Sequence, residues 1–329
     1  MKSRFLLAIN RAEFLTCREK QLVAELVDSE QFFLSLSVDD LSQIVGRILR
    51  ATSWDPARFL HQAEQDVRYL ERESIGTILV TDNAYPAQLG AIYDPPFLLH
   101  YRGTLPAWDR PLVAIVGTRS PSEQALLATR RLAESCAAAG IAVVSGLARG
   151  IDAAAHAGVV SAHGVTLAVL GSGIDVIYPQ AHKALARGIL ANGGALVSEY
   201  PPRTAPTRYH FPERNRIISG LARAVVVAEA PIRSGALITA EYALEQGRDL
   251  FVLREGLDGD SGAGGRNLAA DGSVMVSTAA DIIADWVGGS AAPAAASATV
   301  TVVSADRRPA AAGRQLALEL EAELKVGFK

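Results

Sequence analysis

The chain has 329 residues, of which 49% are hydrophobic and 20% are charged. This balance is typical of a folded globular protein and excludes a largely disordered chain. The 32 Lys and Arg residues against 35 Asp and Glu residues give a net charge of −3, which argues against a histone-like polycation. The only cysteines, Cys17 and Cys136, lack metal-ligand spacing, so neither a disulfide framework nor a structural zinc site is expected.

The N-terminal apolar run FLLAI is shorter than the ~7–15 residues of a signal peptide. No apolar stretch approaches the ~20 residues of a membrane-spanning helix. With so few cysteines, a reducing compartment is favoured. We therefore expect a cytoplasmic protein without a membrane anchor.

Residues 1–74 are predicted to form a small helical domain. One apolar helical face is formed by Leu41, Ile44, Val45, Ile48 and Leu49. The next helix is expected to begin with Asp55 as N-cap and Pro56 at the first helical position. Its apolar stripe consists of Phe59, Leu60, Ala63, Val67 and Leu70. The domain is interpreted either as a structural appendage or as a helix-hairpin-helix that touches a phosphate backbone.

Residues 75–287 are predicted to form an α/β domain. After strand-like segments TILV and FLLHY come short, nearly continuous apolar runs at 113–117, 141–145, 166–171, 195–199, 224–229 and 249–253. Helical segments separate them at 122–139, 152–162, 180–191, 213–222 and 234–246. Such alternation predicts a doubly wound, mainly parallel sheet covered by helices on both faces. Its functional loops are expected at the carboxyl ends of the strands.

The segment 288–329 is predicted to be a low-complexity linker followed by a short helix. Residues 288–313 are rich in Ala, Ser, Gly and Pro. The last segment places Leu316, Leu320 and Leu324 on one helical stripe. This helix could dock a partner or pack on its own chain.

The turn after the first run of the α/β domain has the features of an anion site. Gly117 permits close approach to the backbone, and Arg119 adds a positive charge. A helix start is expected with Ser120 as N-cap, Pro121 at the first position and Glu123 completing a capping box. Its free N–H groups would bind an anion. The alternative is an ordinary turn with a surface arginine.

Similar glycine- or hydroxyl-containing turns follow other strands. They contain Ser145, Gly146 and Arg149, then Gly171 and Gly173, then Ser234 and Gly235 ahead of Thr239. Neighbouring turns of this kind could hold several phosphates on backbone N–H groups. None of them completes a GxGxxG dinucleotide fingerprint, so no NAD-type cofactor is expected.

The stretch 199–216 is predicted to be a long arginine-rich loop. It contains Arg203, Arg208, Arg214 and Arg216, with Tyr209 and Phe211 between them. Lys183 adds a further cation nearby, and residues 111–230 hold eleven Lys or Arg against seven Asp or Glu. Arginines with an interleaved aromatic ring are typical of single-strand binding. The alternative is a solvated rim loop with Phe211 in the core.

Catalytic constellations are incomplete. Asp152 and His156 are four residues apart on a predicted helix, but no nucleophile elbow or HExxH motif accompanies them, and His156 is interpreted as a packing histidine. Glu199 and Glu229 end strands and could pair as acid and base, or be satisfied by nearby arginines. No metal site is expected.

The motifs VAIVGTR, SGLARGIDAAAH, GSGIDVIYP, SEYPP, FPERNRIISGL and EAPIRSGALITAEYALEQGR occur in this order between about residues 80 and 285. In this the chain resembles the DprA (Smf) family of DNA-processing proteins, recombination mediators of natural transformation. The resemblance implies an extended Rossmann-like domain that binds single-stranded DNA, forms a dimer and loads the RecA recombinase onto DNA. It also implies that the helical region is similar to a SAM-like domain.

Carried onto this sequence, the resemblance implies that Arg119 contacts DNA and that the Ser145–Gly146 backbone receives a phosphate. The pocket would be completed by Lys183, Phe211, Arg214, Asn215 and Arg216. The full expected DNA-binding set is Gly117, Arg119, Ser145, Gly146, Arg149, Gly171, Gly173, Lys183, Phe211, Arg214, Asn215, Arg216, Ser234, Gly235 and Thr239.

The chain departs from the family pattern in two places. Residues 253–256 read Leu-Arg-Glu-Gly where the family usually has Pro-Gly, which affects the expected turn and a nearby dimer surface. The winged-helix domain with which many members end is expected to be absent or vestigial.

The expected function is sequence-tolerant binding of single-stranded DNA without catalysis or a cofactor. The alternative is a hydrolase that cleaves the glycosidic bond of nucleoside monophosphates, because SGALITAE, with Gly235, Thr239 and Glu241, faintly resembles such enzymes of related Rossmann-like fold.

Overall fold

The computed structural model describes residues 2–50 and 53–289 of the protein. By their contacts, residues 1–286 form one compact unit, and the chain divides after Trp286. The predicted boundary between residues 74 and 75 therefore falls inside one unit and stays a prediction. The linker and terminal helix expected after residue 289 lie outside the described residues.

The N-terminal region is helical, as expected. Its helices are α1 (Lys2–Asn10), α2 (Cys17–Leu26), α3 (Glu30–Ser35), α4 (Val38–Val45) and α5 (Pro56–Arg72). The start of α5 is confirmed, because the Asp55 carboxylate accepts a hydrogen bond from the Arg58 N–H at 2.9 Å. The apolar face predicted to continue to Leu49 is wrong, since Gly46 ends α4 with φ of 71° and leaves Ile48 83% exposed.

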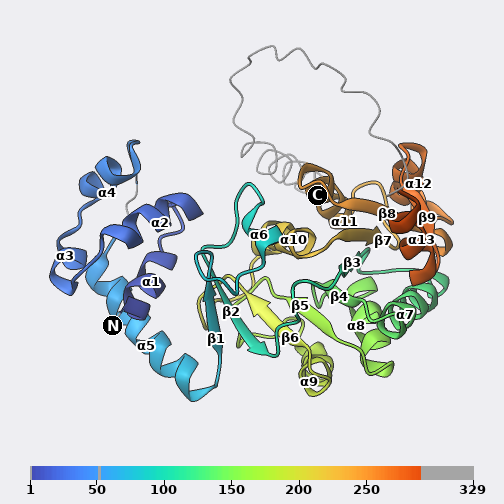
Figure 1. Cartoon of the computed structure of the whole chain (residues 1–329), viewed down its shortest axis with the longest axis horizontal. Coiled ribbons are helices and arrows are strands. Elements are labelled where there is room, and N and C mark those ends of the chain that lie inside the picture. Colours follow the sequence, from blue (N-terminus) through green and yellow to red (C-terminus); the bar gives the residue numbers. More distant parts are fainter. Residues whose placement is uncertain (1, 51–52, 290–329) are drawn as a thin grey trace, which may run out of the picture. The chain divides into compact units, whose positions relative to one another are not determined.

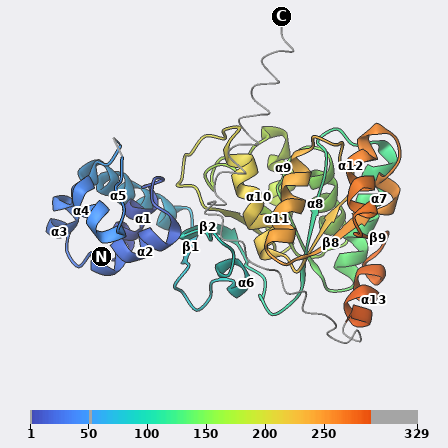
Figure 2. The same ribbon diagram turned by 90° about the horizontal axis from the view of Figure 1, so that it is seen from above.

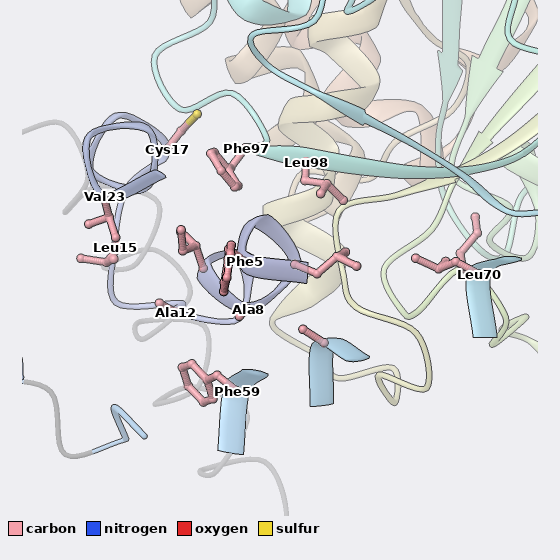
Figure 3. Close-up of a cluster of buried hydrophobic side chains, with 14 of the residues drawn as sticks. Phe5, Ala8, Ala12, Leu15, Cys17, Val23, Phe59, Leu70, Phe97 and Leu98 are labelled. Atoms are coloured by element: carbon pink, nitrogen blue, oxygen red, sulfur yellow. The ribbon is translucent and has the colours of Figure 1, made fainter. Parts of the chain in front are cut away.

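The core of this region extends into the sheet domain. Figure 3 shows Phe97 and Leu98, at the start of β2 (Leu98–Gly103), beside α1, which carries Phe5 and Ala8. The same cluster of buried side chains includes Ala168 of β5 (Thr166–Val169). Apolar burial of this kind, worth about 25 cal/mol per Å² removed from water, joins the helices to the sheet.

Nine strands form one sheet in the order β1-β2-β6-β5-β4-β3-β7-β8-β9. The remaining strands are β1 (Gly76–Leu79), β3 (Leu112–Val116), β4 (Ala142–Ser145), β6 (Ala195–Ser198), β7 (Ala224–Val227), β8 (Asp249–Leu253) and β9 (Val274–Val276). Strands β3 to β9 pair in parallel, whereas β1 and β2 are antiparallel additions beside β6. The doubly wound α/β fold is confirmed.

Helices cover both faces of the sheet (Figures 1 and 2). Their bounds are α6 (Ala87–Gly90), α7 (Glu123–Ala138), α8 (Ile151–Ser161), α9 (Lys183–Ala191), α10 (His210–Leu221), α11 (Gly235–Glu245), α12 (Ala263–Ala270) and α13 (Ala279–Gly289). Short 3₁₀ turns span Gln180–His182, Arg254–Gly256 and Asp260–Gly262. Val113 and Ile115 pack with α7 and α8, while Ala114 and Val116 pack with α10 and α11. Alternate residues of β3 are thus buried on opposite faces, which explains its unbroken apolar run.

The chain after β8 forms elements that were not predicted. Neither β9 nor the helices α12 and α13 was expected, and α13 continues through Gly288 and Gly289, where a linker was predicted. Gly256 packs so closely on the Ala228 carbonyl that no side chain would fit, which fixes the Leu253–Gly256 turn. In the described part of the chain, no helix is long and apolar enough to span a membrane, and no group of His, Cys, Asp and Glu side chains is arranged for a metal.

Candidate nucleic-acid interface

The predicted loops meet at one edge of the sheet, where the parallel strands end. The chain leaves β3 toward β4 on one side, and returns after β6 to β7 on the other side of β3. The carboxyl ends of β3 and β7 therefore form a topological switch point, the usual place for a ligand in an open α/β sheet. The loop containing Gly117, Thr118 and Arg119 leaves β3 at this point.

The start of α7 is occupied by a carboxylate of the protein itself. Glu229, 1% exposed, accepts hydrogen bonds from the backbone N–H of Ser122 at 2.8 Å and from its hydroxyl at 3.3 Å. Ser122 is also the N-cap, since its hydroxyl accepts from the Ala125 N–H at 3.2 Å. The predicted cap at Ser120 is wrong. The positive end of the helix is therefore compensated by Glu229, and a phosphate site there stays a prediction.

The backbone N–H groups of the turn after β4 are also bound by a carboxylate of the protein. The carboxylate of Asp152 accepts from the N–H groups of Gly146, at 3.1 Å, and Ala148, at 3.3 Å. The hydroxyl of the buried Ser145 donates to the Ile115 carbonyl at 2.6 Å. These polar groups of Ser145 and Gly146 thus bind other groups of the protein in this structure, and phosphate binding by this backbone stays a prediction.

Arg214 is part of the protein interior. It lies on α10 and is 3% exposed, and its guanidinium donates to the Gly146 carbonyl at 2.8 Å and to the Val169 carbonyl. A methyl group on Gly146 would lie 2.5 Å from this guanidinium, so the glycine is needed for arginine packing. Burial lowers the pKa of Arg214 to about 10, so the side chain remains a cation at neutral pH. Its guanidinium is thus engaged inside the protein, and its place in the DNA-binding pocket stays a prediction.

Arg216 is committed to an ion pair. Its two terminal nitrogens donate to the two carboxylate oxygens of Glu199, at 2.9 and 2.7 Å, and Asp94 lies 3.5 Å from Nε. Burial by itself lowers the pKa of Arg216, but Glu199 and Asp94 raise it overall. Direct phosphate neutralisation by Arg216 is therefore not supported. Of the two alternatives predicted for Glu199, the structure shows the ion pair with an arginine.

The other predicted glycines are explained by packing within the protein. A methyl group on Gly171 would lie 2.8 Å from the ring of Phe211, and one on Gly117 would lie 2.5 Å from Ile151. Gly173 is buried against the backbone of residues 201–204. The groups that approach these glycines closely belong to the chain itself.

The turn before α11 is only partly accessible. Ser234 caps the helix by accepting from the Ala236 N–H at 3.2 Å, and Gly235 is exposed with open space around it. Thr239 is 1% exposed in this structure, and its contact with DNA stays a prediction. Asn215 donates to the Gly235 carbonyl at 3.4 Å and joins α10 to this turn.

Three predicted cations do face solvent, namely Arg119, Arg149 and Lys183. Hydrogen bonds link their loops: the Ile151 N–H donates to the Thr118 carbonyl at 3.2 Å, and the His182 imidazole hydrogen-bonds the Leu147 carbonyl at 2.8 Å. Within residues 2–50 and 53–289, none of the three cations forms a salt bridge with a carboxylate. These side chains supply positive charge to the strand-end surface.

An aromatic cluster accompanies these cations. The ring of Phe211 lies 5.6 Å from that of Tyr178, at an interplanar angle of 35°, and the Arg119 guanidinium stands 5.2 Å above Phe211. Phe211 lies in the first turn of α10, because the arginine-rich stretch becomes helical at His210, earlier than predicted. Tyr178 was missed as a site residue, although it ends the motif GSGIDVIY.

The candidate acid–base groups are unsuited to catalysis at neutral pH. His156 is fully buried and its Nδ1 is 2.8 Å from the Thr166 hydroxyl, so it is the packing histidine that was expected. Burial lowers the pKa of His156 to about 3 and raises the pKa of Asp152. Among the described residues, Glu199 and Glu229 bind separate partners and do not pair.

Comparisons with known proteins agree with this fold. A family model described as DNA recombination-mediator protein A matches residues 76–287. DNA processing protein DprA of Streptococcus pneumoniae is 37% identical over 270 residues, which cover 81% of this chain and 93% of that protein. Protein Smf of Escherichia coli K12 is 41% identical over 220 residues, or 67% of this chain and 59% of Smf.

Two solved structures are also similar. The X-ray structure of Streptococcus pneumoniae DprA matches with a TM-score of 0.70 and 36% identity, over 86% of this chain and 97% of that one. A structure of Helicobacter pylori DNA processing protein A, described by its single-stranded DNA binding mode, matches with a TM-score of 0.58 and 28% identity, over 65% and 96% of the chains. By sequence and by structure, the chain belongs to the DNA recombination-mediator protein A (DprA/Smf) family.

Proposed function

We propose that the chain binds single-stranded DNA at the carboxyl edge of its parallel sheet. The observation that carries this proposal is the group of exposed cations Arg119, Arg149 and Lys183, which lie on connected loops without carboxylate partners in the described residues. The Tyr178–Phe211 ring pair lies beside Arg119. Cations that follow a phosphate backbone and a ring that stacks on a base are the requirements for sequence-tolerant single-strand binding.

The proposed interface selects phosphates by side-chain charge. Glu229 and Asp152 accept from backbone N–H groups at the start of α7 and after β4, so the proposed interface does not use these donors. With about three exposed cations, the surface fits a short single strand whose affinity falls with salt. Sequence preference is slight, because phosphate contacts carry no base information.

We also propose that the bound strand is handed to the RecA recombinase during natural transformation, and that the protein acts as a cytoplasmic homodimer. Membership of the recombination-mediator family supports the first part, since a mediator must deliver DNA to a recombinase. Assembly of RecA on single strands coated with single-strand-binding protein, followed in the presence and absence of this chain, tests the delivery step. Sedimentation across a concentration series tests the dimer.

The binding proposal is tested by titrating single- and double-stranded oligonucleotides of equal length across a salt series. Wild-type protein is expected to prefer the single strand, and Arg119→Ala is expected to weaken binding and lower the salt slope. Arg130→Ala is a matched control, because this substitution also removes one positive charge. Arg130 lies on α7 and pairs with Glu134 at the surface. Equal slopes for wild type and Arg119→Ala would reject the proposed interface.

The proposed role is non-enzymatic. The residues that suggested a nucleotide hydrolase are poorly placed for it, because Thr239 is buried and Glu241, two residues later, points away from it on α11. Incubation with nucleoside monophosphates and chromatography for released base is the direct test, and base release at a catalytic rate would favour the hydrolase instead.

A further inference from the structure

The aromatic cluster contains two rings in different environments. Tyr178 is 48% exposed, whereas Phe211 is partly buried. Phe211 contacts three groups of the protein: the backbone of Gly171, the ring of Tyr178 and the guanidinium of Arg119. The ring with free surface in this cluster is therefore Tyr178.

Position also distinguishes Tyr178 from other exposed rings. It lies in the turn after β5, followed by the buried Pro179 and by His182, which is fixed to the Leu147 carbonyl. Lys183, one of the three exposed cations, follows His182 directly. The ring is thus held on a rigid support between the Arg119 loop and the start of α9.

We propose that Tyr178 is the base-stacking residue of the DNA interface and that Phe211 is a positioning residue that supports it. This inference rests on the single-strand binding proposed above and adds the residue that contacts a base. A tyrosine that packs one side against Phe211 keeps its other side for a nucleobase, and a rigid aromatic ring loses little conformational entropy on binding. Arg119, beside the ring pair, is placed to hold the adjoining phosphate.

The test distinguishes contacts with the bases from contacts with the phosphate backbone of the DNA. Full-length wild type, Tyr178→Ala and Tyr178→Phe are titrated by fluorescence anisotropy with a labelled thymidine oligonucleotide and with an abasic oligonucleotide of the same length. Tyr178→Ala is expected to lose at least about fivefold in affinity for the first and to match wild type on the second. Tyr178→Phe, which keeps the ring, is expected to remain close to wild type on both.

Tyr209 is the comparison residue, because it is 50% exposed and lies two residues before Phe211. Tyr209→Ala is expected to weaken binding less than Tyr178→Ala on the thymidine oligonucleotide. Three results would overturn the inference: no loss for Tyr178→Ala, an equal loss on both oligonucleotides, or a base-dependent loss confined to Tyr209→Ala. Far-UV circular dichroism and thermal unfolding check that each variant is folded.

The outcome also separates this inference from the proposed function. If wild type binds neither oligonucleotide, single-strand binding itself is rejected, and the role of Tyr178 with it. If wild type binds and Arg119→Ala lowers the salt slope while Tyr178→Ala changes nothing, only the stacking role is rejected.

Discussion

The carboxylate of Glu229 accepts a hydrogen bond from the backbone N–H of Ser122 at 2.8 Å, across 107 residues of sequence. This contact joins the end of β7 to the start of α7 at the switch point of the sheet. It places a negative charge where the fold would otherwise offer an anion site. In the proposed interface, phosphate binding is consequently left to the side chains of the loops around this contact.

We expect Glu229→Ala to lower the free energy of unfolding by about 2 kcal/mol, because the Ser122 N–H loses a charged acceptor and the helix dipole loses its compensation. Glu229→Gln keeps an acceptor and should lose about half as much. Urea unfolding followed by circular dichroism measures both. Glu123→Gln is the control, because Glu123 is an exposed carboxylate in the first turn of α7, the helix that Glu229 contacts. Equal stabilities for Glu229→Ala and this control would contradict the structural role.

A second prediction concerns the contact between Gly146 and Arg214. Gly146→Ala places a methyl group 2.5 Å from a guanidinium that is fixed by two carbonyls, so the guanidinium cannot move away freely. We expect a loss of about 1–3 kcal/mol in the free energy of unfolding, as for other overpacked sites. Gly235→Ala is the matched control, because nothing lies within 4 Å of its added methyl group. A stable Gly146→Ala protein would show that this packing is looser than described.

The strands of the parallel sheet were predictable because they are buried on both faces. The unbroken run at 112–116 reflects Val113 and Ile115 on one face and Ala114 on the other. Strand β9 gave no such signal, since it has three residues and Val274 and Met275 are partly exposed. Its pairing with β8 is a tertiary contact, which the local pattern of hydrophobic residues does not predict.

The sequence predicted which cations of the candidate site are exposed, but not which of its polar groups bind other parts of the protein. Sequence identified Arg119, Arg149 and Lys183 as cations of the strand-end loops, and all three are exposed. It also placed Arg214 and the Gly146 backbone at the DNA site, although the Arg214 guanidinium and the Gly146 carbonyl bind each other across 68 residues. A charged residue looks the same in sequence whether it faces solvent or a carbonyl 68 residues away.

A third prediction concerns acid stability. Burial lowers the pKa of His100 and of His156 to about 3, whereas an unfolded histidine titrates near 6.5. As pH falls below 6.5, these histidines become protonated in the unfolded chain but stay neutral in the folded chain. The free energy of unfolding therefore decreases. Each histidine should contribute a slope of about 1.4 kcal/mol per pH unit between about pH 6 and pH 4. Urea unfolding at a series of pH values measures the slope.

His100→Leu isolates one half of this effect. Neither ring nitrogen of His100 has a hydrogen-bond partner in the described part of the protein, so an apolar side chain of similar size should be tolerated at pH 7.5. The variant should reduce the acid slope by about 1.4 kcal/mol per pH unit. His163→Asn, at an exposed position, is the control for substitution of a histidine. An unchanged slope in His100→Leu would mean that this histidine is protonated in the folded protein.

The last prediction distinguishes exposed cations from structural arginines. Lys183→Gln and Arg149→Gln should each reduce the slope of log affinity against log salt by about 0.7, the value for one phosphate contact to a single strand. Combined with Arg119→Gln, the reduction should reach about 2. Arg130→Gln removes the same charge from α7 and should leave the slope unchanged. If the triple variant keeps the full slope, phosphates are held by other cations, and the exposed Arg208 and Arg233 are the next to test.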